Sequence, residues 1–204
     1  ANVTEEGVSF VYEKRRQKGA VYNVYAAADI KRADGTVVYK QGALVKENLA
    51  TGDDGSATLK GLYLGTYRVT EMKAPTNLIC AGESKEVTLS YAGQNVEVAV
   101  GDLTFVNDRQ KAKVFAEKQD KDTKKSLAGA VFGLYAGKDI KNQDGQVVVA
   151  KDTLIAKATT DEMGSGAFAA DIPNNNSYYV KELQAPANYF RNSDEVYSFD
   201  FQYT

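Results

Sequence analysis

Two stretches of the chain, about 110 residues apart, each place a single carboxylate on the apolar side of a predicted strand. They are Tyr67–Pro75, which carries Glu71, and Tyr178–Pro186, which carries Glu182. In both, a tyrosine precedes the glutamate by four residues and a valine by two, and residues two apart in a strand share a face. Glutamate is rarely buried unless it is paired, so a single case would suggest a solvated strand end. The same placement in two copies favours a carboxylate with a function.

The composition of the chain limits the reactions in which these carboxylates can take part. The 204 residues include no histidine and one cysteine, Cys80, which argues against histidine-based catalysis, an internal disulfide and the usual zinc sites. We therefore expect no metal and no cofactor. The net charge of −2 gives no basic surface for nucleic acid, and no apolar run approaches the length of a membrane span. With 43% hydrophobic and 25% charged residues, the chain has the composition of a globular protein.

The elements that must position the two glutamates also occur twice. Gly19–Ala26 matches Gly129–Ala136, and an Asp-Gly turn follows at the same distance in each copy. Short apolar segments between turn residues, together with 13 tyrosines and no tryptophan, predict an all-β sandwich for each copy. The polar stretch Asn107–Lys113 marks a junction without a flexible linker. We expect two tandem domains, 1–109 and 110–204.

One combination of motifs resembles a known family. The second copy carries Lys118-Gln-Asp, a polar turn and Leu127–Ala136, and the phrase Tyr-x-Val-x-Glu-x-x-Ala-Pro follows in both copies. This combination closely resembles the Cna protein B-type domains, which occur in tandem in Gram-positive surface adhesins and in the backbone subunits of sortase-assembled pili. The resemblance covers nearly the whole chain, twice. It implies two tandem inverse-immunoglobulin (prealbumin-like) β-sandwiches that act as stalk or spacer modules.

The resemblance also implies a location and partners. We expect an extracellular protein that is anchored to the cell wall in its full length and is not an enzyme, apart from chemistry on itself. Its partners would be the neighbouring domains of the same surface protein, and the chain itself would be a monomer.

Many members of the family carry an isopeptide bond that they form themselves, between a lysine of the first strand and an asparagine of the last, with help from the glutamate. A protonated amine is not a nucleophile, so burial has to lower the pKa of such a lysine. Burial must also raise the pKa of the glutamic acid, so that its neutral form can polarise the amide carbonyl and relay protons. Apolar surroundings can do both without a histidine.

In the first copy the resemblance makes Glu71 the assisting acid and Asn107 the acceptor. Asn107 shares a face with the apolar residues two and four positions before it, as burial requires. Lys14 is the candidate nucleophile, at the end of an alternating apolar run. A competing alignment matches residues 8–18 to residues 103–111, which hold the last strand and the polar residues after it. In that alignment residues 7–18 belong to the end of a preceding domain, and the first copy lacks its lysine.

In the second copy Lys118 and Glu182 fit the family pattern as nucleophile and acid. The counterpart of Asn107 would lie beyond Thr204, and Asn188 and Asn192 are in the wrong region to replace it. We therefore expect the second sandwich to lack its last strand in this chain, to form no isopeptide bond, and to expose a strand edge that can pair with other chains.

Two other functions compete for the same residues. Four aromatics could form a platform for a host matrix protein or glycan, which would make the chain a ligand-binding adhesin module: Tyr178, Tyr179, Tyr189 and Phe190. A period-2 core explains most of them better, although Tyr179 should face outward. A glycosidase needs a second carboxylate close to the first, and nothing in the sequence brings one near Glu71 or Glu182.

Overall fold

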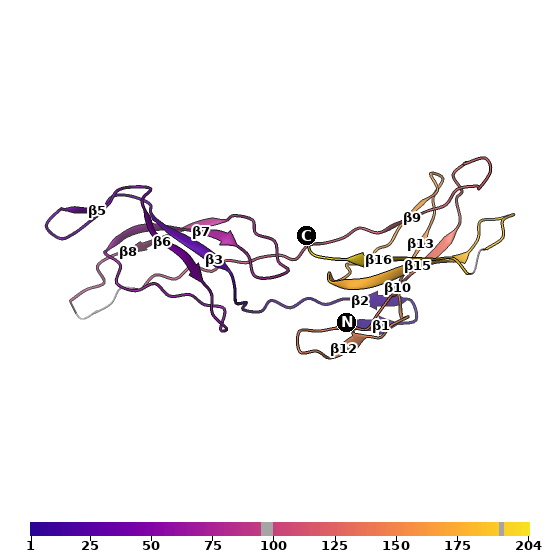
Figure 1. Ribbon diagram of the computed structural model, residues 1–204, viewed down its shortest axis with the longest axis horizontal. Coiled ribbons are helices and arrows are strands. Elements are labelled where there is room, and N and C mark those ends of the chain that lie inside the picture. The colour runs from indigo at the N-terminus through magenta and orange to yellow at the C-terminus, as the bar shows by residue number, and fades with distance from the viewer. Residues whose placement is uncertain (95–99, 192–193) are drawn as a thin grey trace. The chain divides into compact units, whose positions relative to one another are not determined.

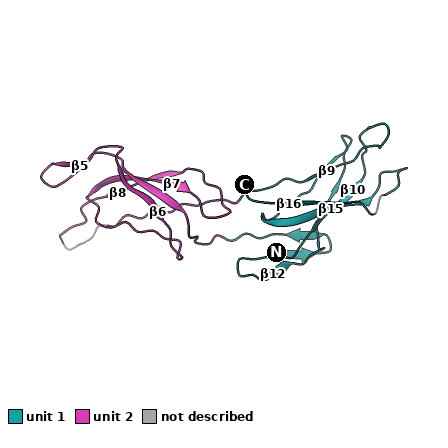
Figure 2. Cartoon of the chain, in the orientation of Figure 1, with its two compact units in different colours: residues 1–13, 110–204 teal, residues 14–109 magenta. Residues whose placement is uncertain are grey.

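A computed structural model describes residues 1–94, 100–191 and 194–204. All regular elements in these ranges are β-strands, so the described chain has no helix long and apolar enough to cross a membrane. The chain divides into two compact units, coloured separately in Figure 2. Unit 2 consists of residues 14–109 and holds the first repeat, whereas unit 1 consists of residues 1–13 and 110–204 and holds the second.

The main sheet of unit 2 has the strand order β6-β3-β7-β8, with antiparallel neighbours (Figure 1). A small antiparallel pair, β4-β5, lies between β3 and β6 in sequence. The strands are β3 (Val21–Ala26), β4 (Ile30–Lys31), β5 (Val37–Tyr39), β6 (Leu44–Ala50), β7 (Gly65–Lys73) and β8 (Ser84–Leu89).

The turn between β4 and β5 is the predicted Asp-Gly turn. Gly35 has a φ of 86°, a left-handed conformation that glycine adopts at little cost. The backbone N–H of Thr36 donates to the Asp34 carboxylate at 2.9 Å, and this hydrogen bond holds the pKa of Asp34 below its usual range.

Unit 1 repeats this plan with the sheet order β13-β10-β15-β16 and the pair β11-β12. Two further pairs, β14-β9 and β1-β2, have no counterpart among the described strands of unit 2. The strands are β1 (Asn2–Thr4), β2 (Gly7–Ser9), β9 (Phe115–Glu117), β10 (Val131–Ala136), β11 (Ile140–Lys141), β12 (Val147–Val149), β13 (Leu154–Thr159), β14 (Ser165–Ala167), β15 (Asn176–Gln184) and β16 (Val196–Phe201).

The end of each glutamate-bearing strand has the same geometry in both units. After the Ala-Pro pair, Asn77 and Asn188 adopt left-handed φ values of 67° and 69°. The chain then closes a turn onto the proline, because the N–H groups of Leu78 and Tyr189 donate to the proline carbonyls at 3.2 and 3.1 Å. Asparagine tolerates this conformation better than most residues, which explains why it occupies the position twice.

Residues 1–13 belong to a different unit from the one that the sequence-based domain boundaries give them. The expected first domain, 1–109, loses these residues to unit 1, where Val8 is buried in the core of the second repeat. The backbone of Gly7 lies against Ile155 of β13 so closely that a Cβ would come 2.3 Å from the Ile155 carbonyl oxygen. The Tyr12 hydroxyl donates to the Asp171 carbonyl at 2.6 Å. This segment thus packs on the second repeat through tertiary contacts, which local sequence periodicity cannot foresee.

Candidate functional site

The first candidate site lies on β7, where Glu71 points into the core of unit 2. Glu71 is directly opposite Tyr22 of β3 and is 2% exposed. The side-chain nitrogen of Asn107 donates to Glu71 Oε2 at 2.8 Å and to the Ile79 carbonyl at 3.1 Å. Glu71 Oε1 is buried and has no hydrogen-bond partner among the described residues. The structure therefore brings the predicted acid and acceptor of the first repeat into direct contact.

The segment that carries Asn107 is held by side chains from two strands of the sheet. Lys85 of β8 donates to the Thr104 carbonyl at 2.5 Å and lies 5.0 Å over the ring of Phe105. The ring of Tyr22 contacts the same phenylalanine, with centroids 4.8 Å apart. Burial alternates along residues 103–107 as a period of two predicts.

The electrostatic surroundings of this site include one further titratable ring. Burial raises the pKa of the Tyr22 hydroxyl, and the charge of the Glu71 carboxylate adds to this effect. Tyr22 therefore stays a neutral phenol at physiological pH and forms part of the wall around the carboxylate.

The second candidate site lies on β15, where Glu182 is directly opposite Phe132 of β10. Glu182 is 6% exposed, and its Oε1 lies 3.0 Å from Nζ of Lys118, whose side chain is 24% exposed. Apart from this ion pair, Oε1 has no hydrogen-bond partner in the described chain. The predicted acid and nucleophile of the second repeat are thus in contact.

Lys14 does not reach Glu71 in this structure. It is exposed, and among the described residues it makes no ion pair with that carboxylate. In unit 1, the backbone of Lys118 lies beside Gly164, where a glycine Cβ would meet the Lys118 carbonyl at 2.6 Å. A Cβ on the matching Gly55 would meet the Arg16 Cβ at 2.6 Å and the Gln17 nitrogen at 2.7 Å, and a Cβ on Gly164 would meet the Ser126 Cβ and the Leu127 nitrogen in the same way. Arg16 therefore corresponds to Ser126. The two alignments that the sequence allows both stay predictions; in this structure Lys14 lies in solvent.

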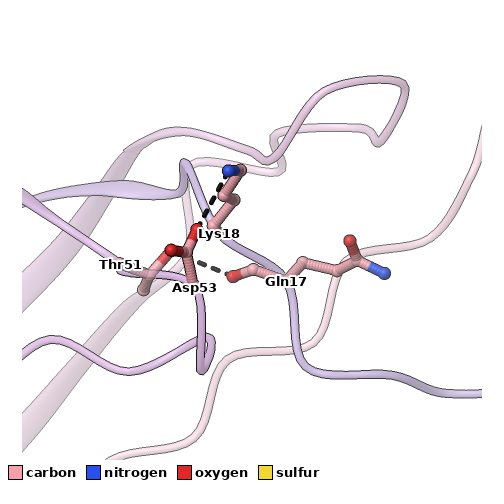
Figure 3. Close-up of polar contacts among 4 residues, drawn as sticks. All are labelled: Gln17, Lys18, Thr51 and Asp53. Atoms are coloured by element: carbon pink, nitrogen blue, oxygen red, sulfur yellow. Dashed lines mark hydrogen bonds and ion pairs between the residues drawn. The ribbon is translucent and has the colours of Figure 1, made fainter.

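The start of unit 2 is fixed by contacts that Figure 3 shows. Thr51 Oγ1 donates to the Gln17 carbonyl at 3.0 Å, and Lys18 Nζ lies 2.9 Å from Asp53 Oδ1. The equivalent threonine of unit 1, Thr160, donates in the same way to the Leu127 carbonyl at 2.8 Å. Gln17 therefore corresponds to Leu127 in space, and the described part of the first repeat reaches this point without a strand like β9.

The strand after the Ala-Pro turn corrects one part of the sequence alignment. In sequence, Glu86–Tyr91 aligns with Glu195–Asp200, so that Glu86 matches Glu195. The sheet instead pairs Val87 with Tyr67 and Phe199 with the equivalent Tyr178. The Phe199 ring stacks on the Tyr178 ring at 5.7 Å, so aromatic packing sets the register instead of the matching glutamates.

A small hollow opens beside the Lys118–Glu182 pair. Its walls are Glu117, Lys118, Phe132, Glu182, Glu195 and Tyr197. A hydrogen bond with Glu195, burial and the charges of Glu195 and Glu182 raise the pKa of Tyr197 to about 12. Sequence reasoning missed Tyr197, because the shifted alignment hid its place opposite Val180.

The aromatic residues considered for a binding platform do not act as one group. Tyr178 is 1% exposed and belongs to the core, whereas Tyr179 faces outward and stacks on Tyr135 at 5.1 Å. Tyr189 donates to Asp120 at 3.0 Å, and Phe190 is fully exposed. Asn192 lies outside the described residues.

Cys80 is exposed. Its thiol donates to the Glu71 backbone carbonyl over 3.8 Å.

Comparison with known proteins places this geometry in a family. A profile of the SpaA prealbumin-like fold domain matches residues 11–104 and 112–203. No curated protein matches the chain. Among solved structures, the Bacillus anthracis TIE protein is similar over 94% of this chain, with 26% identity and a TM-score of 0.57, and the match spans only 29% of that protein.

Pilin structures are also similar, at lower TM-scores. The shaft pilin SpaA from Lactobacillus rhamnosus GG is 14% identical, with 97% of this chain and 90% of that chain covered and a TM-score of 0.36. The streptococcal ancillary pilin is 21% identical, with coverages of 91% and 54% and a TM-score of 0.32. The expected all-β, prealbumin-like fold and its tandem duplication are confirmed by the profile match. Because that match covers most of the chain in two successive copies, the protein belongs to the SpaA prealbumin-like fold domain family and carries two tandem members of it.

Proposed function

We propose that the two units are stalk modules of a cell-surface protein or pilus, each built around a glutamate that serves Lys–Asn isopeptide chemistry. The observation that carries this proposal is the 2.8 Å contact between Asn107 and a Glu71 carboxylate that is 2% exposed. A buried carboxylate is costly unless it has a task or a partner, and here a side-chain amide lies directly against it.

The bond forms when a neutral lysine Nζ attacks Cγ of the asparagine side chain. A new C–N bond replaces the old one, the amide nitrogen leaves as ammonia, and a protonated glutamate polarises the carbonyl and returns protons to the leaving group. Among the described residues, each unit brings two of the three groups together. Unit 2 has the acid and the acceptor, Glu71 and Asn107, whereas unit 1 has the nucleophile and the acid, Lys118 and Glu182.

A stalk benefits from such a bond because it joins the first strand to the last. Pulling force then crosses the module through covalent bonds, and redox conditions do not affect the link. We also propose that the full protein is extracellular and anchored to the cell wall, with neighbouring domains as its partners. No observation on the described residues favours a host ligand over this role.

The proposal is tested by giving unit 2 the first-strand segment of unit 1. Residues 13–18 are replaced by residues 117–128, which carry the first-strand lysine and its longer loop. We expect the intact mass of the folded chimera to fall short by one ammonia. By analogy with a disulfide that closes a loop of about 90 residues, the bond should add about 4–5 kcal/mol to the free energy of unfolding.

The matched control is the same chimera with arginine in place of the transplanted lysine, which should keep its full mass. A folded chimera that also keeps its full mass would show that Glu71 and Asn107 are not isopeptide machinery. The unaltered chain should have its full mass as well. A loss of ammonia there, mapped to a Lys14–Asn107 link, would instead assign the nucleophile of the first repeat to Lys14.

A further inference from the structure

Residues 1–13, here called the arm, belong to unit 1 although they precede unit 2 in the chain (Figure 2). Unit 2, residues 14–109, is therefore an insertion between two parts of unit 1, and both of its ends connect to that unit. A tension applied along the chain enters unit 1 at the arm and leaves it after β16. While the arm stays bound, this tension crosses unit 1 and does not pass through unit 2.

The arm is held on unit 1 mainly by the packing of a few side chains. Val8 is the one buried residue of the arm, all of which the structure describes, and Phe10 packs against the same core from a partly buried position. The Tyr12 hydroxyl donates to the Asp171 carbonyl at 2.6 Å. Strand β2 pairs with β1 in a separate two-stranded sheet, so the arm adds no strand to the main sheet.

The strands of the main sheet of unit 1 are held more firmly, by ladders of backbone hydrogen bonds. Strand β16 pairs with β15 at six consecutive positions, and β15 pairs with β10 on its other side. Separating β16 from β15 breaks a whole ladder, whereas the arm leaves when Val8 and Phe10 lose their packing. Parts of a protein with few buried apolar contacts open at a lower free energy than its core. The arm should therefore detach at a lower tension than the main sheet.

The arm has a defined place to which it can return. The backbone of Gly7 lies so close to β13 that a Cβ would come 2.3 Å from the Ile155 carbonyl oxygen, and its φ of 149° is one that other residues rarely adopt. A shift by one residue would bring a Cβ against this carbonyl and turn Val8 away from the core. Because unit 2 keeps the arm tethered, rebinding is intramolecular and does not depend on protein concentration.

We infer that the arm is a force-sensitive clasp. In its bound state it keeps unit 2 free of tension. When tension detaches it, unit 2 comes under load, and the chain lengthens by the folded length of unit 2 plus up to about 45 Å for the extended arm. When the tension falls, the arm rebinds and the chain shortens. The use of this clasp in a stalk rests on the proposed function, whereas the clasp itself follows from the order of the segments in the chain.

The test stretches the full chain in optical tweezers between handles at Ala1 and Thr204. We expect a first, reversible lengthening while both units stay folded, and unfolding of the units at higher tension. Val8→Ala should raise the ratio of open to closed clasp at a given tension about five- to thirtyfold, because apolar contact with the core is lost. Ser9→Ala, on the exposed face of the same strand, should leave this ratio unchanged.

A second attachment point separates the clasp from other openings of unit 1. In Lys113→Cys combined with Cys80→Ser, one handle is attached at residue 113 and the other stays at Thr204; Lys113 and Cys80 are both exposed. The arm and unit 2 then carry no tension, so the first lengthening should be absent while unfolding of unit 1 remains.

A first lengthening that occurs with both attachments, or that Val8→Ala leaves unchanged, would overturn the clasp. So would traces from Ala1 to Thr204 in which a unit unfolds without an earlier reversible step. The mass of the chimera of unit 2 does not depend on the arm, so it tests the isopeptide proposal separately from these traces.

Discussion

Glu71 and Glu182 occupy the same position of the same strand in two copies of one fold, but their partners differ. In unit 2 the carboxylate accepts from an amide, and in unit 1 it faces an amine. Strand periodicity buries the glutamate in both cases, whereas the segments at the two ends of each repeat decide what it meets. Both copies keep the acid, and the differences lie in the first and last strands.

The cores of the two units differ as well. Among the described residues, unit 1 buries fourteen apolar residues, including Val8, and unit 2 buries seven. Equivalent positions are more exposed in unit 2: Ile172 is fully buried, while its counterpart Leu62 is only partly buried. Residues 1–13 and the β9-β14 pair account for this difference, because they cover apolar side chains that unit 2 leaves closer to solvent.

The largest expected effect tests that difference in packing. Ile172→Ala should lower the free energy of unfolding of unit 1 by about 2–5 kcal/mol, because it leaves a cavity in a close-packed core. Leu62→Ala should cost unit 2 less, since its side chain is already partly solvated. Hydrogen exchange read out separately for each unit during urea unfolding measures both. Equal losses would contradict the difference in core packing.

The next effect concerns the partners of the two glutamates. Lys118→Met should destabilise unit 1 by about 2–3 kcal/mol, less than for a fully buried pair because the lysine keeps 24% exposure. Asn107→Ala should destabilise unit 2 by about 1–3 kcal/mol through loss of one hydrogen bond to a buried carboxylate.

Thermal unfolding of each variant gives these values. In unit 1, Glu182→Leu added to Lys118→Met should recover most of the loss, since no unpaired charge then remains. If the double variant were as unstable as the single one, the loss would come from packing and not from the buried charge.

A smaller effect should follow from residues 1–13. Val8→Ala should destabilise unit 1 by about 1–2 kcal/mol, because Val8 is buried in its core. Unit 2 should not change, although Val8 precedes it in sequence. Ser9→Ala, on the exposed face of the same strand, is the control. We expect faster hydrogen exchange in β13 but not in β6. The reverse pattern would show that residues 1–13 pack on the first repeat instead.

The smallest effect concerns the loop of unit 1 that contains Asp120. Asp120 accepts from Thr123 and from the Tyr189 hydroxyl, and these hydrogen bonds lower the pKa of Asp120 to about 2. A lowered pKa stabilises the fold above the ordinary aspartate range, and this contribution is lost as pH falls from about 4 to about 2. Carboxyl NMR of Asp120 should show that titration. In Tyr189→Phe the midpoint should rise, and an unchanged midpoint would exclude the tyrosine as a cause.

Much of the fold and of the candidate site could be predicted from local sequence. A period of two placed Glu71 and Glu182 on buried faces, and the same period placed Asn107 on the inward side of its segment. The Asp-Gly turns, the Ala-Pro strand ends and the duplication are also local or repeated features. These predictions succeeded because the backbone alternates independently of what lies across the core.

Tertiary contacts were needed to show which segments belong together. The sequence allowed Lys14 as a nucleophile, but the folded chain leaves Lys14 in solvent. It likewise could not assign Val8 to unit 1, or set the register of β16 by the packing of Phe199. The physical reason is that such pairings depend on competition between strand edges and on loop lengths. Local patterns thus predicted two buried carboxylates, and the folded chain brought one of them to an amide and the other to an amine.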